Sequence, residues 1–261
     1  MKSVYNHNDV FWIDLESPSR DEVADAARAA KLDIHKVEEL LSPSLKHKVE
    51  FGKEHPYLYI VLHFPAFGES KNGDAAYEVD FILTKQVVIT ARYERVESIE
   101  KFHPTEESET GIFFGLLGEL LANFEHKLSS VDHWVRDIEK KMFEGQEKQT
   151  IIELSEASRH LIDFRKITAI YPEVFESLIN EGGEIFGKKF SEKSKEMLER
   201  FEKSRAKLNM LFETVHELRE TNNALLSTKQ NESMKVLTKV TIIATILVGI
   251  ALIWVGLLAI K

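Results

Sequence analysis

Residues 240–260 read VTIIATILVGIALIWVGLLAI, an uncharged apolar run that is followed by Lys261. At 1.5 Å per residue, about 21 residues of α-helix extend roughly 31 Å, the thickness of the hydrocarbon core of a bilayer. The run therefore predicts one membrane-spanning helix, with the remainder of the chain in water. A buried core helix is the less favoured interpretation, because core helices of this length rarely stay apolar on every side.

Lysines around this run predict its orientation. Lys229, Lys235 and Lys239 precede the run, whereas only Lys261 follows it. Because basic residues gather on the cytoplasmic side of membrane helices, we expect a single-pass protein of the cell (inner) membrane with a cytoplasmic N-terminal domain. The opening residues MKSVYNHNDVFWIDLE hold no apolar signal-peptide core. We therefore expect late insertion, as a tail anchor or as the first span of something longer.

Composition excludes several classes of function. The chain has 34 Lys and Arg against 43 Asp and Glu, a net charge of -9, which argues against a nucleic-acid partner. It has no cysteine, so disulfides, thiolate catalysis and cysteine-based zinc sites are excluded. We find neither a nucleophile motif nor a phosphate-binding glycine loop, and we expect a non-enzyme without a cofactor.

The first hundred residues alternate between strand and helix patterns. Ser19, Asp21 and Glu22 supply a cap and acidic residues for a helix start, and Pro18 precedes them. Apolar and β-branched runs predict strands, and the last two of these form a hairpin. The predicted strands are 11–15, 49–51, 57–64, 77–83 and 87–93, the predicted helices are 23–32 and 34–41, and a turn is expected at 68–74.

From about residue 111 the pattern becomes helical. Apolar spacing predicts helices at 113–143, 150–179 and 191–226, with Gly145 ending the first and Pro172 kinking or breaking the second. Residues 181–184, EGGE, predict a turn. No glycine or proline lies between Ser191 and Val248, so the third helix either continues into the membrane or meets the span at a hinge near Ser227 and Thr228.

The predicted fold is therefore an α+β cytoplasmic head with a mixed sheet and flanking helices. It is followed by a long helical bundle and stalk that continues into one C-terminal transmembrane helix. The predicted domains are a cytoplasmic α/β subdomain at 1–105, a helical bundle and stalk helix at 106–234, and a transmembrane helix at 235–261.

A polar stripe enters the membrane along one side of this last helix. A helical wheel places an amide, a thioether and three hydroxyls on that side, together with branched apolar residues. Several copies around an axis would line a narrow passage that holds a hydrated cation and closes by dewetting. Packing between helices is the alternative, because threonine bonds its own helix backbone and small residues favour close contact. The candidate pore-lining residues are Asn231, Met234, Leu237, Thr238, Thr241 and Thr245.

Histidines do not predict a metal site here. His126 and His133 share one helix face but lie about 10 Å apart, which is too far for one ion without ligands from other helices. We interpret both as solvated surface residues, and any metal ligands remain unassigned.

Several segments together resemble the CorA-like divalent metal ion transporter family. The segment that leads from stalk to first span is 231–238, NESMKVLT, with 241–246, TIIATI. The head adds 12–18 (WIDLESP), 36–41 (KVEELL), 46–50 (KHKVE), 57–62 (YLYIVL), 79–83 (VDFIL) and 88–92 (VITAR). The resemblance covers nearly the whole chain, and its specificity rests on the order and spacing of these segments.

This resemblance implies a cytoplasmic head, a helical bundle and a stalk helix that continues into the first span of a homo-oligomer, a pentamer in the best-known members. It also implies transport of a divalent cation such as magnesium through the lipid bilayer. Asn231, Met234 and Leu237 then take pore-lining or gating positions at the cytoplasmic side.

The sequence departs from the family at the outer end of the span. The family closes this span with Gly-Met-Asn, before a short loop and a second span. Counted along the helix from Met234, the position of this motif is occupied by residues 254–257, WVGL. We interpret the chain as a divergent member that lacks the motif and the second span, with a sequence that stops before the second span as the alternative. An early stop alone does not explain the missing motif, because the first span reaches its expected place. Two functions stay open, a divalent cation channel or transporter subunit and a non-transporting single-span membrane scaffold or regulator.

Overall fold

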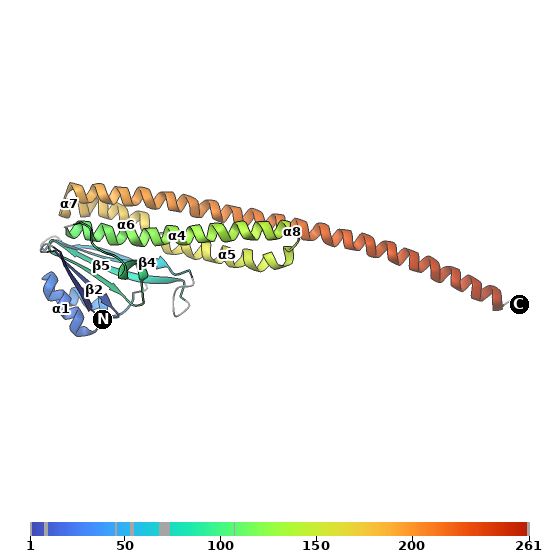
Figure 1. Cartoon of the computed structure of the whole chain (residues 1–261), viewed down its shortest axis with the longest axis horizontal. Helices are drawn as coiled ribbons and strands as arrows, with labels where there is room; N and C mark the ends of the chain where they lie inside the picture. Colours follow the sequence, from blue (N-terminus) through green and yellow to red (C-terminus); the bar gives the residue numbers. More distant parts are fainter. Residues whose placement is uncertain are drawn as a thin grey trace.

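The computed structural model describes residues 2–7, 10–44, 46–52, 55–67, 74–106 and 108–259, with the backbone alone for residues 7, 36, 251 and 253–259. The chain forms a sheet-based head, a helical bundle that covers one face of the sheet, and one helix that extends far beyond both (Figure 1). The predicted turn at 68–74 lies almost entirely outside the described residues.

A six-stranded mixed sheet forms the centre of the head. Its strands in spatial order are β1 (Lys2–His7), β2 (Val10–Glu16), β6 (Val87–Arg92), β5 (Ala76–Thr84), β4 (Tyr57–Pro65) and β3 (Lys48–Gly52). Strands β2 and β6 are parallel, and the other neighbouring strands are antiparallel. The sequence predicts all of these strands except β1, which has only two apolar side chains. One of them, Tyr5, stacks on Trp12 of β2 with ring centroids 4.5 Å apart.

Side chains of β4 alternate between two cores. Leu58 and Ile60 belong to the core that the sheet shares with the helical bundle, whereas Tyr59 and Val61 face a second helical layer. Because both faces are covered, β4 is apolar along most of its length, as expected for a central strand. The second layer consists of α1 (Arg20–Ala30), α2 (Ile34–Val37) and the 3-10 helix η1 (Glu38–Leu41).

Helix α1 begins where the sequence predicts. The backbone N–H of Glu22 donates to the Ser19 hydroxyl, and the Glu22 carboxylate accepts from the Ser19 N–H, which completes a capping box. At its end, Lys31 adopts a left-handed conformation with φ 55°, and its N–H reaches the last carbonyls of the helix. The helix predicted at 34–41 is divided between α2 and η1.

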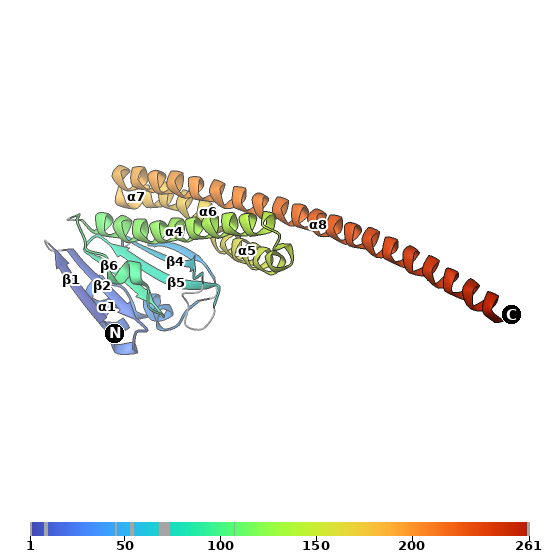
Figure 2. The same ribbon diagram turned by 45° about the vertical axis from the view of Figure 1, so that its right-hand side comes forward.

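Several helices follow the sheet, and the long ones, α4, α5 and α8, pack against one another (Figure 2). Proline at the start of α6 separates it from α5, which confirms the break predicted at Pro172. In chain order the helices are α3 (Glu97–Glu100), α4 (Glu109–Phe143), α5 (Glu147–Thr168), α6 (Tyr171–Ser177), the π-helix η2 (Leu178–Gly182), α7 (Gly183–Phe186) and α8 (Lys188–Ala259).

The turn predicted at 181–184 is wrong. Both Gly182 and Gly183 are helical, at the junction of η2 and α7, and the chain turns instead at Gly187. Gly187 has φ 94° and ψ 175°, a conformation that is essentially restricted to glycine. A Cβ on Gly182 would lie 2.5 Å from the Phe190 ring, so this glycine allows close packing rather than a turn.

Aromatic rings anchor α8 in the bundle. Phe201 is 1% exposed, and its ring centroid lies 5.1 Å from that of Tyr171, 6.0 Å from that of Phe175 and 6.4 Å from that of Phe124. These contacts join α8 to α6 and α4. The first part of α8 is therefore a structural member of the bundle.

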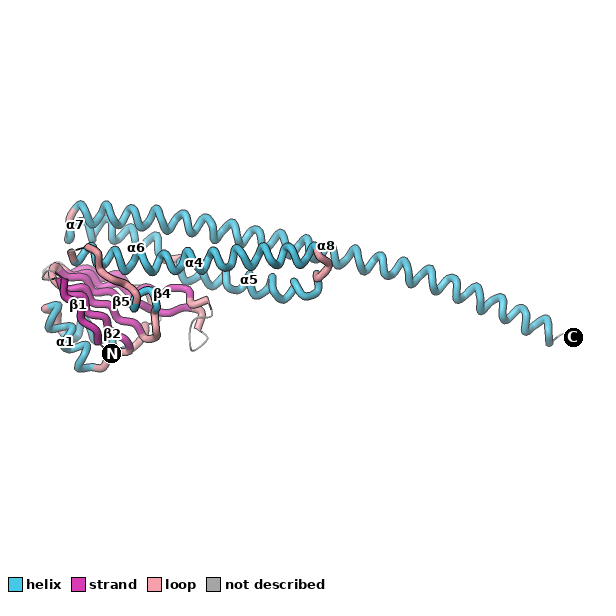
Figure 3. Tube along the Cα trace, viewed as in Figure 1, coloured by secondary structure: helices cyan, strands magenta, loops and turns pink. Residues whose placement is uncertain are grey.

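Beyond the corner between α4 and α5, α8 continues alone as an unbroken helix (Figure 3). Its 72 residues extend about 108 Å at 1.5 Å per residue. The continuous alternative is thus confirmed, and the hinge near Ser227 and Thr228 is not formed.

Candidate functional site

The surroundings of α8 change along its length. In its first half one face is buried in the bundle, through Phe190, Phe201, Leu208, Leu211, Val215 and Leu218. Every side chain from Ser227 to Val248 is exposed, including large apolar residues on all sides of the helix. Among the described residues, α8 is the helix long and apolar enough to cross a membrane. From Val240 onward this exposed helix carries no charged side chain up to Val248, and large apolar residues cover most of its surface, which fits a lipid environment.

A cluster of polar residues holds α8 where it leaves the bundle. Asn222 is 1% exposed, and its Nδ2 donates to the Glu147 carbonyl over 3.0 Å while its Oδ1 accepts from the Thr150 hydroxyl over 3.2 Å. Lys229 Nζ lies 2.6 Å from one oxygen of the Glu147 carboxylate. The hydrogen bond from Lys229 lowers the pKa of Glu147. We call these four residues the junction, since they clasp α8 against the start of α5.

Sequence reasoning missed the junction. Its members on α5 and α8 are separated by more than seventy residues, and short-range patterns do not reveal such a contact. One signal was available, because Asn222 continues the spacing of three and four residues that runs through Leu211, Val215 and Leu218. A polar residue at a core position of a helix indicates a specific buried partner.

The predicted pore-lining residues lie just beyond the junction, on the part of α8 that no other element covers. The three threonine hydroxyls donate to backbone carbonyls four residues earlier, at distances of 2.8 to 2.9 Å. Each hydroxyl oxygen keeps acceptor capacity on its outer side. The side chains of all six residues are exposed: Asn231, Met234, Leu237, Thr238, Thr241 and Thr245.

One chain arranges these six residues as a line along a single helix, not as a ring. Two of them, Met234 and Leu237, also line a pocket of about 850 Å³ beside the α4–α5 corner, together with Gln146, Lys229 and Ser233. The near end of the stripe therefore lies next to the bundle, while its far end is separated from the bundle by several helical turns.

Metal-binding clusters of three or more His, Asp or Glu side chains are absent from the part of the chain that the structure describes. His126 and His133 are both exposed, and His133 Nδ1 lies 2.7 Å from the Ser129 carbonyl, which confirms that they are surface residues. At 254–257 the backbone is helical, and the side chains lie outside the described residues. The departure from Gly-Met-Asn stays a prediction.

Comparison with known proteins gives a consistent result. The sequence model of the family described as CorA-like Mg2+ transporter protein matches residues 7–253. The chain is 26% identical over 256 residues to the cobalt/magnesium transport protein CorA of Thermotoga maritima, covering 90% of this chain and 68% of that protein.

Solved structures resemble the fold at lower identity. The complete CorA magnesium transporter of Methanocaldococcus jannaschii matches with a TM-score of 0.73 and 16% identity, covering 89% of this chain and 75% of the other. The full-length CmaX protein matches with a TM-score of 0.73 and 13% identity, covering 87% and 72%. At these identities the structures establish the shared fold, a mixed sheet with helices followed by a long helix.

Proposed function

The chain belongs to the CorA-like Mg2+ transporter protein family, and from this premise we propose that it is a subunit of a divalent cation channel or transporter. In this proposal several copies of the exposed segment of α8 surround one pore, and magnesium is the transported ion. The protein forms a homo-oligomer, a pentamer by resemblance to the family, in the cell (inner) membrane with its head in the cytoplasm.

One observation carries the proposal: α8 passes without a break from the buried core of the bundle into an apolar segment that its own chain leaves uncovered. A single such helix in lipid would need no polar stripe. In a ring of copies the stripe turns inward, where hydroxyls and amides meet water, and the apolar sides face lipid and neighbouring helices.

The chemistry of the stripe suits a hydrated hard cation. Magnesium prefers oxygen ligands and gives up its waters reluctantly, so a pore binds it through its hydration shell. The Thr238 and Thr241 hydroxyls donate to their own helix backbone, so their outward oxygens accept hydrogen bonds from those waters. Rings of Met234 and Leu237 would form an apolar constriction that closes by losing its water.

The lysines before the span support the orientation. Lys229, Lys235 and Lys239 lie on the bundle side of the apolar segment, as basic residues do on the cytoplasmic side of membrane helices. The head and bundle are then cytoplasmic.

Replacement of Met234 tests the pore. Met234→Ala removes a flexible side chain from every copy at once, which widens an apolar constriction and favours its hydration. We expect an intact oligomer with increased magnesium leak into liposomes. The matched control is Val236→Ala, because Val236 is 62% exposed against 60% for Met234 but lies on another side of the helix. This control should leave the flux unchanged.

Two results would overturn the proposal. The original protein and Met234→Ala are both reconstituted in one orientation. If neither shows magnesium flux, the result favours the non-transporting scaffold. A looser oligomer in Met234→Ala, with mass measured in mild detergent, would place Met234 in a packing contact between helices instead of a pore.

A further inference from the structure

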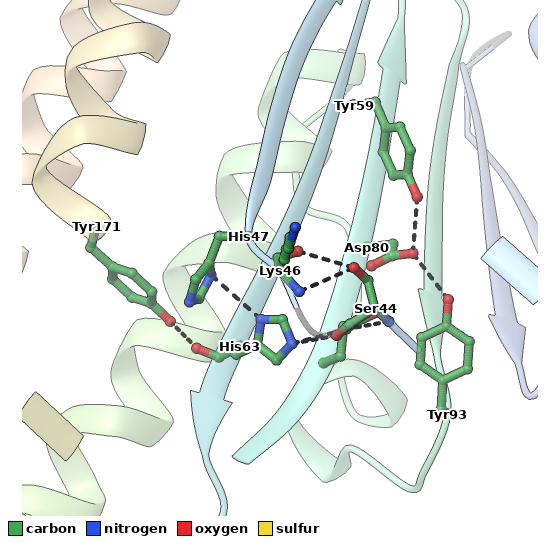
Figure 4. A network of polar contacts seen from close by, with 9 residues as sticks. Ser44, Lys46, His47, Tyr59, His63, Asp80, Tyr93 and Tyr171 are labelled. Atoms are coloured by element: carbon green, nitrogen blue, oxygen red, sulfur yellow. Dashed lines mark hydrogen bonds and ion pairs between the residues drawn. The ribbon is translucent and has the colours of Figure 1, made fainter. Parts of the chain in front are cut away.

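Two histidines of the head face each other across a short gap. His47 lies just before β3 and His63 lies in β4, and their Nδ1 atoms are 3.4 Å apart. Their ring centroids are 4.6 Å apart, with the ring planes at 78°. Figure 4 shows the two rings turned toward each other through these nitrogens. His47 is half-buried and the His63 side chain is 18% exposed, so the pair is accessible from solvent.

The separation fits two ligands of one metal ion. Zinc binds imidazole nitrogen at 2.0–2.1 Å in tetrahedral geometry, which places two ligand nitrogens about 3.3–3.4 Å apart. The observed 3.4 Å between the two Nδ1 atoms matches this separation.

Neighbouring groups fix the orientation of His63. Its Nε2 lies 2.9 Å from the Ser44 carbonyl and 2.9 Å from a Glu78 carboxylate oxygen. Two acceptors at this nitrogen place a proton on Nε2, so in the neutral ring Nδ1 presents its lone pair to His47. Glu78 is held in turn by the Ser44 backbone N–H, 2.8 Å from each of its oxygens. A ligating histidine that donates its other N–H to a carboxylate is the usual support of a zinc site.

We propose that His47 and His63 form a binding site in the head for a borderline divalent transition-metal ion such as zinc, with water in the remaining positions. Imidazole nitrogens select such ions over magnesium, which prefers oxygen. The site is on the opposite side of the sheet from the bundle and is distinct from the stripe of α8.

Its position would connect three parts of the molecule. The ion would join the segment before β3 to β4 through His47 and His63. The His63 backbone carbonyl also accepts a 2.8 Å hydrogen bond from the hydroxyl of Tyr171 in α6 (Figure 4). Occupation of the site would therefore hold the segment before β3 onto a strand that already contacts the helical bundle.

Zinc titration of the full-length protein in detergent tests the site, with a chromophoric chelator as competitor and millimolar magnesium present to occupy oxygen sites. We expect one zinc ion per chain and its loss in His47→Gln. Glu78→Gln should bind zinc about tenfold more weakly, since outer partners of metal ligands contribute about 10–100-fold to affinity. His133→Gln is the matched control and should bind like the original protein.

Copper provides a second readout that does not depend on affinity. With one equivalent of Cu2+, electron paramagnetic resonance should show two coordinated imidazole nitrogens in the original protein and fewer in His47→Gln. Circular dichroism checks that each variant is folded. Equal zinc binding in His47→Gln and the original protein, or equal loss in His133→Gln, would overturn the proposal. Because binding rather than flux is measured, this result is separate from the outcome for the pore.

Discussion

Asn222 is the last buried polar residue of α8 before the helix becomes exposed, and its replacement tests the junction. In Asn222→Ala the hydrogen bond from Nδ2 to the Glu147 carbonyl is lost, and so is the one from the Thr150 hydroxyl to Oδ1. The single Thr150 proton is shared between Oδ1 and the Glu147 carbonyl, which lies 3.0 Å from the hydroxyl oxygen, and in the variant it bonds to that carbonyl alone. The variant therefore leaves no partner without a hydrogen bond.

The expected cost follows from these contacts. One net hydrogen bond is lost, because the Thr150 proton moves to the Glu147 carbonyl that Nδ2 no longer reaches, and one net bond contributes about 1 kcal/mol. Alanine also favours the helix over asparagine by about 0.6 kcal/mol, which would hide part of this loss. Asn223→Ala removes that ambiguity, because Asn223 is exposed and the change in helix propensity is the same. The difference between the two variants should then be about 1 kcal/mol.

Hydrogen exchange of the full-length protein in detergent, followed by mass spectrometry, measures this difference. Because about 1.4 kcal/mol corresponds to a factor of ten, amides at the start of α5 should exchange about fivefold faster in Asn222→Ala than in Asn223→Ala. Peptides from the sheet should exchange alike in both variants. Equal protection of the α5 amides in the two variants would refute the idea that Asn222 holds the corner to α8.

Further variants test the rest of the structure. Phe201→Ala should lower the free energy of unfolding by about 3–5 kcal/mol, because it opens a cavity among aromatic rings, and chemical denaturation measures this loss. Burial, and to a lesser extent the Glu78 charge, raises the pKa of Asp80 to about 8. The folded protein therefore keeps a proton on Asp80 between about pH 4 and pH 8, whereas the unfolded chain releases this proton near pH 4. Asp80 should therefore reduce stability as pH rises from about 4 to 8, and melting temperatures of Asp80→Asn should lack this part of the decline. Gly187→Ala should destabilise the protein by about 1–3 kcal/mol, because the φ of Gly187 is positive. Gly118→Ala is the control, because Gly118 lies in a helix and has ordinary space for a Cβ, and thermal unfolding should show a neutral or stabilising effect.

Local patterns were sufficient for most elements. The capping residues of α1 and the proline break before α6 act over a few residues, so the sequence predicts them directly. Strand β1 was missed because its pairing with β2 supplies the stability that its own side chains do not indicate. The glycine pair 182–183 was misread, because close packing against Phe190 and a turn both favour glycine.

The sequence by itself determined the apolar segment at 240–260 and the hydroxyls on one side of its helix, because helical periodicity is a property of neighbouring residues. It left open a continuous helix or a hinge near Ser227 and Thr228, and the structure forms the continuous helix. Tertiary structure alone decided that Glu147 and Asn222 meet at the junction and that His47 faces His63. These contacts join residues that are far apart along the chain, and only the packing of the helices and the register of β3 on β4 bring them together.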